Sequence, residues 1–362
     1  MRSLKVISIL VLALMIPFSG CKKSTSSEPV RLLGWAVGSS DGFYGTILHT
    51  EDGGLTWTRQ GDSLLFANVD FADLCIIDEN TLIAVGSSSD SVPACVFRSF
   101  DRGNTWQRVV TDSLPAISYN GIYAIGSDHL WIVGESGMIF HSNDLGEHWK
   151  RLYPPYIYQF WPFFRVAAKD PSNIWVVGDS YSADSFPVML HSVDSGNSWI
   201  RLNPLKSMGI QESKGGHYLG IKVYGNSIWA IGGFGKFVIR STNEGENWSN
   251  VTAVGGLGDA NDLFLYNDRI AYLVTDYNGI YYTNNAGTQW YDYSYITGDW
   301  YLGVAWLPPS NVWVVGSPGA GQAHSVIIHS PNDGKSWIDQ TPPVLVSTDI
   351  ALYKVRFIAV EE

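Results

Sequence analysis

The chain has 362 residues, of which 45% are hydrophobic and 14% aromatic, so it can bury a large core and is not a disordered acidic chain. Its 23 Lys and Arg residues against 34 Asp and Glu residues give a net charge of −11, which argues against a nucleic-acid-binding surface. The 37 glycines and 15 tryptophans favour short aromatic strands joined by tight turns.

Residues 1–20 are typical of a lipoprotein signal peptide. Two basic residues precede the apolar run Val6–Phe18, which is too short to cross a bilayer as a stable helix. The run leads into Ser19-Gly20-Cys21, which resembles a bacterial lipobox, where cleavage before the cysteine leaves a thiol that carries a diacylglycerol. The alternative is an ordinary secretory peptide. In either case we expect the protein to leave the cytoplasm.

Residues 21–30 form a polar tether, and Cys21 is the expected site of lipid attachment. Because the body of the protein is acidic, anionic lipid would repel it, so we expect membrane contact only through the acyl chains on Cys21. These features predict a monomeric lipoprotein of the cell envelope, at the outer membrane.

From residue 31 to residue 361 we expect a single domain, because one motif, Ser/Thr-x-Asp/Asn-x-Gly-x-x-Trp, recurs seven times. Its tryptophans lie 42 to 50 residues apart, which is the length of four short strands with their turns. The acidic or amide residue and the tryptophan of the seven copies are Asp52 and Trp57, Asp101 and Trp106, Asp144 and Trp149, Asp194 and Trp199, Asn243 and Trp248, Asn285 and Trp290, and Asn332 and Trp337.

An apolar segment precedes each motif, as in Trp35-Ala36-Val37-Gly38. It is apolar on both faces, as a strand between two neighbouring sheets would be. One strand before this segment and one on each side of the motif give four strands per repeat. Seven such repeats predict an all-β fold, a seven-bladed β-propeller of four-stranded antiparallel blades.

The two ends of the repeated region are complementary. The first repeat begins at its second strand, Leu32–Val37, whereas Ile350–Val360 forms a strand after the last motif. We therefore expect the C-terminal strand to complete blade one and close the ring, which removes exposed sheet edges. In the same meander Cys75 and Cys95 lie two strands apart, too far for a disulfide, and are predicted to be free, buried thiols.

The motif is identified as the Asp-box, or BNR repeat. Its short acidic or amide side chain can accept hydrogen bonds from turn amides, its glycine supplies an unusual backbone angle, and its tryptophan packs beneath the hairpin. Asn at three of the seven positions is a poor metal ligand and no general base, which favours a structural role. Seven boxes, each after a Trp-x-Val-Gly strand, resemble the YCF48-like photosystem II assembly factors. The resemblance implies a non-catalytic propeller that binds partner proteins.

Sialidases and xyloglucanases also carry these boxes, so a sialidase-like glycoside hydrolase is the alternative. A sialidase needs three arginines that converge on a carboxylate. Only Arg31, Arg165 and Arg356 remain for a central site once the arginines of outer strands and turns are set aside. His49, His141, His191 and His329 precede boxes of different blades and cannot converge on one metal ion. We expect no catalytic residue, metal or cofactor.

Two loops between blades are rich in aromatic residues, which suit a protein partner or, alternatively, a glycan. A further alternative is that many of these rings fill blade interfaces. The candidate partner surface comprises Tyr153, Tyr156, Tyr158 and Trp161 between blades three and four, and Tyr293, Tyr295, Trp300 and Tyr301 between blades six and seven.

Overall fold

The computed structural model describes residues 30–61, 64–88, 94–179, 187–209, 216–233, 237–252, 258–277, 279–295, 300–318, 325–345 and 350–361. The predicted signal peptide, Cys21 and all but the last residue of the predicted tether lie outside this part of the chain. No helix among the described residues is long and apolar enough to cross a membrane.

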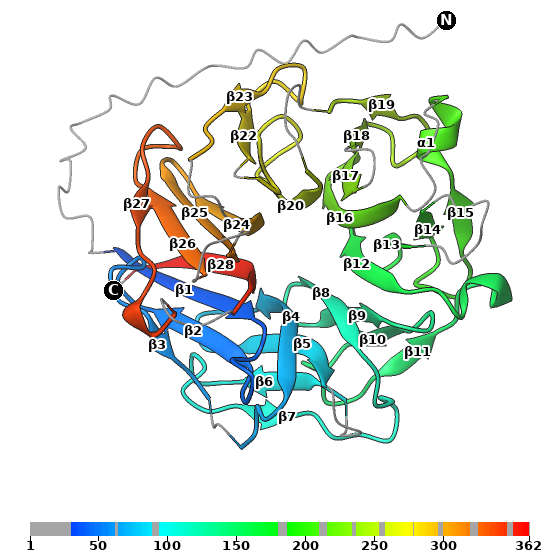
Figure 1. Cartoon of the computed structure of the whole chain (residues 1–362). Coiled ribbons are helices and arrows are strands. Elements are labelled where there is room, and N and C mark those ends of the chain that lie inside the picture. Colours follow the sequence, from blue (N-terminus) through cyan, green and yellow to red (C-terminus); the bar gives the residue numbers. More distant parts are fainter. Residues whose placement is uncertain are drawn as a thin grey trace, which may run out of the picture.

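Seven four-stranded antiparallel sheets stand around a central axis, which confirms the predicted β-propeller (Figure 1). From the innermost strand outward, blade 1 is β28 (Leu352–Glu361), β1 (Val30–Gly38), β2 (Thr46–Thr50) and β3 (Thr58–Arg59). Blade 2 is β4 (Val69–Ile76), β5 (Leu82–Ser88), β6 (Val96–Ser99) and β7 (Gln107–Arg108). Blade 3 is β8 (Tyr119–Ile125), β9 (His129–Gly134), β10 (Ile139–Ser142) and β11 (Lys150–Leu152). Blade 4 is β12 (Phe163–Ala168), β13 (Ile174–Gly178), β14 (Val188–Ser192) and β15 (Ile200–Leu202). Blade 5 is β16 (His217–Tyr224), β17 (Ser227–Gly233), β18 (Phe237–Ser241) and β19 (Ser249–Asn250). Blade 6 is β20 (Ala260–Leu265), β21 (Ala271–Thr275), β22 (Gly279–Thr283) and β23 (Tyr291–Asp292). Blade 7 is β24 (Trp300–Leu307), β25 (Asn311–Ser317), β26 (Val326–Ser330) and β27 (Ile338–Asp339).

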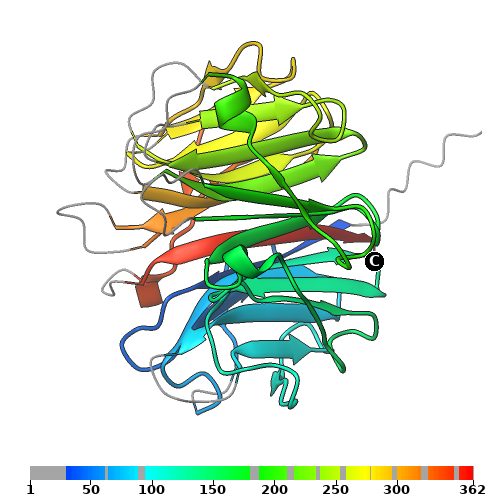
Figure 2. The same ribbon diagram turned by 90° about the vertical axis from the view of Figure 1, so that its right-hand side faces the viewer.

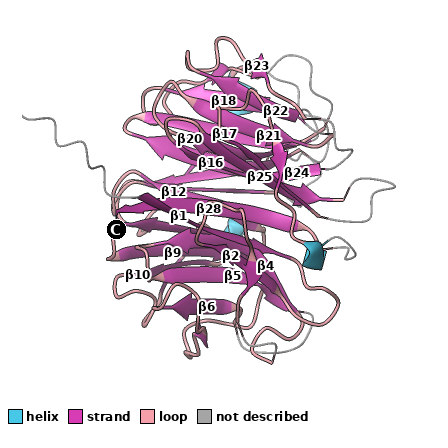
Figure 3. Ribbon diagram, turned by 90° about the vertical axis from the view of Figure 1, so that its left-hand side faces the viewer, coloured by secondary structure: helices cyan, strands magenta, loops and turns pink. Residues whose placement is uncertain are grey.

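Helical structure in the described residues is confined to single turns, as the secondary-structure colouring of Figure 3 shows. These are η1 (Tyr156–Tyr158), α1 (Pro204–Ser207) and η2 (Pro343–Leu345).

The C-terminal strand closes the ring as predicted. β28 pairs antiparallel with β1 from Val30 opposite Glu361 to Gly38 opposite Leu352. The ring of Phe357 on β28 stacks on the indole of Trp313 in blade 7, with centroids 3.6 Å apart. The last strand therefore joins the first and seventh blades, and the sheet edges at the ends of the chain are paired.

The second strand of each blade lies between two neighbouring sheets. Its large aromatic residue is fully buried in six blades: Trp35, Trp131, Trp175, Trp229, Tyr272 and Trp313. The apolar core consequently consists of clusters that span blade interfaces; one of them contains Trp131 of blade 3 with Ile174 and Trp199 of blade 4.

The seven motifs form seven equivalent turns between the third and fourth strands, which we call box turns. In the second box turn, Ser99 donates a hydrogen bond to Asp101 at 2.8 Å and accepts one from the amide of Gly103 at 2.8 Å. The carboxylate of Asp101 accepts a bond from the amide of Thr105 at 2.8 Å. All seven turns repeat these three bonds. The short polar side chains thus satisfy backbone donors that the tight turn would otherwise leave unpaired.

Two successive residues of every box turn have a positive φ. In the second turn these are Arg102 at 62° and Gly103 at 82°. The carbonyl of Arg102 accepts a bond from the indole of Trp35 in the preceding blade at 3.2 Å, and that of Gly53 accepts one from Trp313 at 3.0 Å. At these two blade interfaces the box turn therefore also joins one blade to the next.

The four singled-out histidines lie on the third strands of four blades, as expected. Each stacks on the indole of the adjacent second strand, with centroids 4.2 to 4.9 Å apart. Burial lowers the pKa of all four, to about 4 for His141 and His329. Cys75 and Cys95 are free, as predicted, but only Cys95 is buried, because Cys75 lies on an innermost strand that faces the axis.

Candidate functional site

The propeller has two distinct faces. Since strands alternate in direction within a blade, the connections between blades and the loops from second to third strands meet on one side, which we call the loop face. The box turns lie on the opposite side, the box face, where β1 begins and β28 ends (Figure 2).

The aromatic loop between blades 3 and 4 is exposed only in part. Tyr156 is 75% exposed and Tyr153 is also exposed, whereas Tyr158 is half-buried. Trp161 is only 8% exposed, so its assignment to a partner surface was wrong. Its indole packs edge-on against Tyr158 at 5.0 Å and belongs to the core between the two blades, because burying so large an apolar ring stabilises that interface.

The second aromatic loop, between blades 6 and 7, is also divided. Trp300 is 40% exposed, and Tyr293 and Tyr295 are half-buried. Tyr301 is fully buried, and its hydroxyl donates to the carbonyl of Tyr295 at 2.6 Å, so its assignment to the surface was wrong. The reason is that Tyr301 lies on β24 at a position that points into the blade interface, and buried Tyr119 and Tyr218 occupy the same position of β8 and β16.

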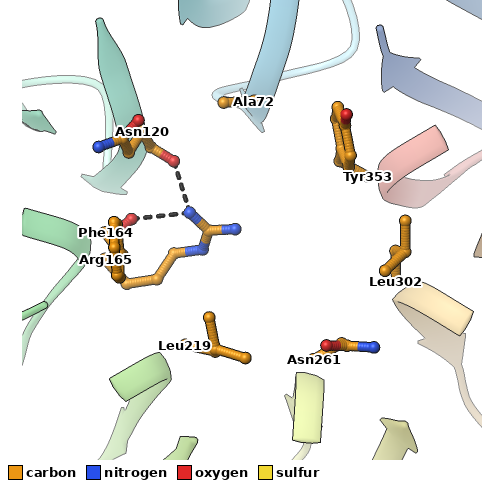
Figure 4. Close-up of a pocket in the computed structure, with 8 residues that line it drawn as sticks. All are labelled: Ala72, Asn120, Phe164, Arg165, Leu219, Asn261, Leu302 and Tyr353. Carbon is orange, nitrogen blue, oxygen red and sulfur yellow. Dashed lines mark hydrogen bonds between the residues drawn. The ribbon is translucent and has the colours of Figure 1, made fainter. Parts of the chain in front are cut away.

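A cavity of about 280 Å³ lies where the seven innermost strands surround the axis (Figure 4). We call it the channel mouth. Besides Arg165, the lining consists of one residue from each blade: Ala72, Asn120, Phe164, Leu219, Asn261, Leu302 and Tyr353. Each of these is the residue skipped where the pairing register of the innermost strand shifts. Such a bulge redirects a side chain, and here it turns one from every blade toward the axis.

Polar groups at the channel mouth are held in place by neighbouring blades. Arg165 reaches into the cavity and donates to the carbonyls of Asn120 at 2.5 Å and Phe164 at 2.7 Å (Figure 4). The amide of Asn261 donates to Asp276 at 2.7 Å and to the carbonyl of Tyr301 at 2.9 Å. Burial raises the pKa of Tyr353, so its hydroxyl stays protonated. The mouth therefore combines apolar walls with a few fixed polar groups, as ligand sites do.

Deeper in the channel, two aspartates bind cations of the C-terminal strand. Lys354 contacts Asp262 at 3.0 Å, and Arg356 contacts Asp73 at 3.2 Å and Asp262 at 4.0 Å. Burial opposes the ionisation of Asp262, but Lys354, Lys222 and Arg356 outweigh it and lower the pKa of this carboxyl. Asp262 is thus held as an anion, which is the wrong state for a proton donor.

The three arginines left for a central site do not converge. Arg165 and Arg356 both line the channel, but Arg31 pairs with Glu51 of the first box turn. No group of three metal-ligating side chains occurs among the residues that the structure describes. Sequence reasoning reached Arg165 and Arg356 by elimination but missed the channel mouth, because no single residue type recurs at its lining positions in all blades.

Solved structures of similar fold include two YCF48 proteins. One, described as YCF48 bound to D1 peptide, has a TM-score of 0.56 and 16% identity, and the match covers 82% of this chain and 92% of the other. YCF48 from Cyanidioschyzon merolae has a TM-score of 0.57 and 16% identity, with 83% and 97% covered. An ancestral GH74 enzyme has a TM-score of 0.51 and 13% identity, with 87% and 47% covered. At these identities the likeness shows the fold alone.

No curated protein compared with the chain matches it significantly. The family model described as photosynthesis system II assembly factor YCF48 does match, over residues 31–154 and 162–295. Because these segments make up more than half of the chain, the protein belongs to the YCF48 assembly-factor family.

Proposed function

We propose that this chain is a non-catalytic propeller that binds a protein partner by receiving a peptide segment at the channel mouth. The observation that carries the proposal is the mouth itself, to which each blade contributes one bulged residue. In the same proposal the protein is lipid-anchored through Cys21 at the outer membrane and acts as an assembly or scaffolding factor for an envelope complex.

The chemistry of the mouth suits a peptide. Its volume of about 280 Å³ admits a few side chains but no folded domain. Leu219, Leu302 and Phe164 offer apolar contacts, while Arg165 and the asparagines offer fixed polar groups that can bind main-chain or side-chain oxygens.

The exposed aromatic residues of the loop between blades 3 and 4 extend the same proposal. The innermost strands begin on the loop face, and the bulged residues lie in the first half of each strand, so the mouth is on that side of the channel. Tyr153, Tyr156 and Phe160 lie on a connection of the same face, so a partner seated at the mouth can also contact them. The YCF48 structure described as bound to D1 peptide supports peptide recognition within the family. The identity of the partner here does not follow from that structure.

The electrostatics of the channel support a non-catalytic role. Glycoside hydrolysis ordinarily needs one carboxyl that is protonated at working pH and a second carboxylate nearby. The channel aspartates instead form ion pairs with Arg356 and Lys354. A glycan-binding or hydrolytic role is retained as the alternative that the experiment distinguishes.

Site-specific photo-crosslinking tests the proposal. A photoreactive amino acid placed at Leu219 in the mouth, in the membrane-extracted protein, should give a covalent adduct with a discrete protein. Leu55, which is 80% exposed on a box turn, is the matched control position and should give none. The Leu302→Ala/Tyr353→Ala variant should reduce the adduct at Leu219.

Two results would contradict the proposal. One is equal crosslinking at Leu219 and Leu55. The other is absence of any protein adduct together with retention on a polysaccharide array that depends on Tyr156 and Trp300, which would establish the glycan alternative.

A further inference from the structure

A second cavity, of about 290 Å³, lies in the channel beside the mouth. We call it the channel chamber. Its lining comes from β4, β8, β12, β16 and β28, and includes Asp73, Cys75, Arg165, Lys222 and Arg356. Arg165 also lines the mouth, so its guanidinium lies between the two cavities. The side chain of Arg356 is 24% exposed, which shows that solvent reaches the chamber.

The chamber lining carries more positive than negative charge, although the protein has a net charge of −11. Three cationic side chains and one carboxylate, Asp73, line it. That carboxylate already has partners: it accepts bonds from the amides of Leu74 at 2.9 Å and Ile122 at 3.4 Å, and it pairs with Arg356 at 3.2 Å.

The nearest other carboxylate is also committed. Asp262 pairs with Lys354 at 3.0 Å and accepts a bond from the amide of Val304 at 3.3 Å. Two carboxylates therefore face four cations, Arg165, Lys222, Lys354 and Arg356, so the channel has an excess of positive charge.

Arg165 and Lys222 carry that excess. Among the described residues, neither forms an ion pair, and the hydrogen bonds of Arg165 go from one guanidinium nitrogen to two backbone carbonyls. Burial lowers the pKa of Lys222; Asp262 and Asp73 oppose the effect, whereas Arg356 and Arg165 add to it. Both aspartates are already paired with Lys354 and Arg356, so they balance the positive charge of the channel only in part. An anion in the chamber would balance the rest and lower the cost of the buried charge.

We propose that the channel chamber binds a small oxyanion, a phosphate-like or carboxylate ion, between Arg165, Lys222 and Arg356. Planar guanidinium groups bind two oxygens of such an ion at once, and the ammonium group of Lys222 supplies a compact third charge. The site needs no partner protein, so the inference does not depend on the proposed function, although the two sites share Arg165.

Thermal denaturation of the purified full-length protein tests the site. Sodium phosphate and sodium sulfate are compared with sodium chloride at equal ionic strength, so that general screening is the same in each series. We expect saturable stabilisation by phosphate or sulfate with one ion per chain, because a ligand that binds only the folded state raises the unfolding temperature.

Substitutions at Lys222 test whether the oxyanion binds in the channel chamber. Lys222→Met should weaken the apparent affinity for the oxyanion by about tenfold or more, whereas Lys222→Arg should retain binding because it keeps the charge. Lys335→Met removes an exposed lysine of a box turn and is the matched control, which should bind as the wild type does.

A crystal soaked in tungstate gives an independent measurement. Its anomalous signal should lie between Arg165, Lys222 and Arg356. Equal stabilisation by phosphate and chloride, unchanged binding by Lys222→Met, or tungstate only on the outer surface would each overturn the proposal.

Discussion

The box turns and the bulged positions of the channel mouth both recur once in every blade, but the box turns repeat the same residue types whereas the mouth does not. At the rim, all seven box turns keep the same three hydrogen bonds, made by the same few residue types. At the channel mouth, the equivalent positions carry Ala72, Asn120, Phe164, Leu219, Asn261, Leu302 and Tyr353. The residues of the box turns repeat because every blade must form the same turn. The residues of the channel mouth vary because their side chains meet only in the assembled ring.

Removal of a charge in the channel should give the largest loss of stability. We expect Asp262→Ala to lower the free energy of unfolding by about 3–5 kcal/mol, because it leaves buried Lys354 without its partner. Urea denaturation measures the loss. Asp268→Ala, which removes an exposed carboxylate, is the control, and an equal loss in both variants would contradict the prediction. Asp262→Ala/Lys354→Met should recover part of the stability, since no unpaired charge remains.

A box turn should show a smaller loss that is nearly the same in different blades. We expect Ser192→Ala to cost about 1–3 kcal/mol, because it leaves the buried amide of Gly196 without the acceptor now at 2.8 Å. Ser241→Ala should cost a similar amount in the next blade, where the bond to Gly245 is 2.9 Å. Urea denaturation compares both with Ser249→Ala, an exposed control, and widely different losses would show that the box turns are not equivalent.

The stacked histidines should make stability depend on pH. Burial lowers the pKa of His329 from 6.5 to about 4, so between these values the unfolded chain binds more protons than the folded one. Its contribution is therefore fully present above about pH 6.5 and is lost as the pH falls toward 4. The slope of the unfolding free energy against pH is proportional to the number of protons taken up on unfolding. We expect His329→Tyr to reduce that number by up to about one in this window.

Urea denaturation at pH 7.5, 6 and 4.5 measures that slope. Tyrosine is a suitable replacement, because Tyr282 occupies the same position in blade 6 and packs on Tyr272 with ring centroids 4.9 Å apart. An unchanged slope in His329→Tyr would show that this histidine does not titrate on unfolding.

The exposed aromatic residues of the loop face should show the smallest effect on stability. We expect Tyr156→Ser to change the free energy of unfolding by less than about 0.5 kcal/mol, because the ring is 75% exposed. The same variant should weaken crosslinking of a partner from Leu219. A large loss of stability would mean that the ring supports the loop rather than a binding surface.

The sequence by itself determined the architecture. The spacing of the box motifs predicted seven blades, and the doubly apolar Trp-x-Val-Gly segments predicted strands between sheets. The missing first strand at one end and the extra strand at the other predicted that β28 pairs with β1. These features are readable because each arises from contacts within one repeat or between adjacent repeats, and seven copies separate the pattern from chance.

The site required the tertiary structure. Trp161 and Tyr301 have the same residue types as the exposed aromatics beside them, and only packing between blades decided that both are buried. The channel mouth could not be predicted from a repeated motif, because its seven equivalent positions carry five different residue types and come from strands far apart in the sequence. Arg165, Lys222 and Arg356 lie on three separate strands, and their shared environment exists only after the ring closes. Local chemistry fixes a repeat, whereas a central cavity depends on side chains that the closed ring brings around one axis.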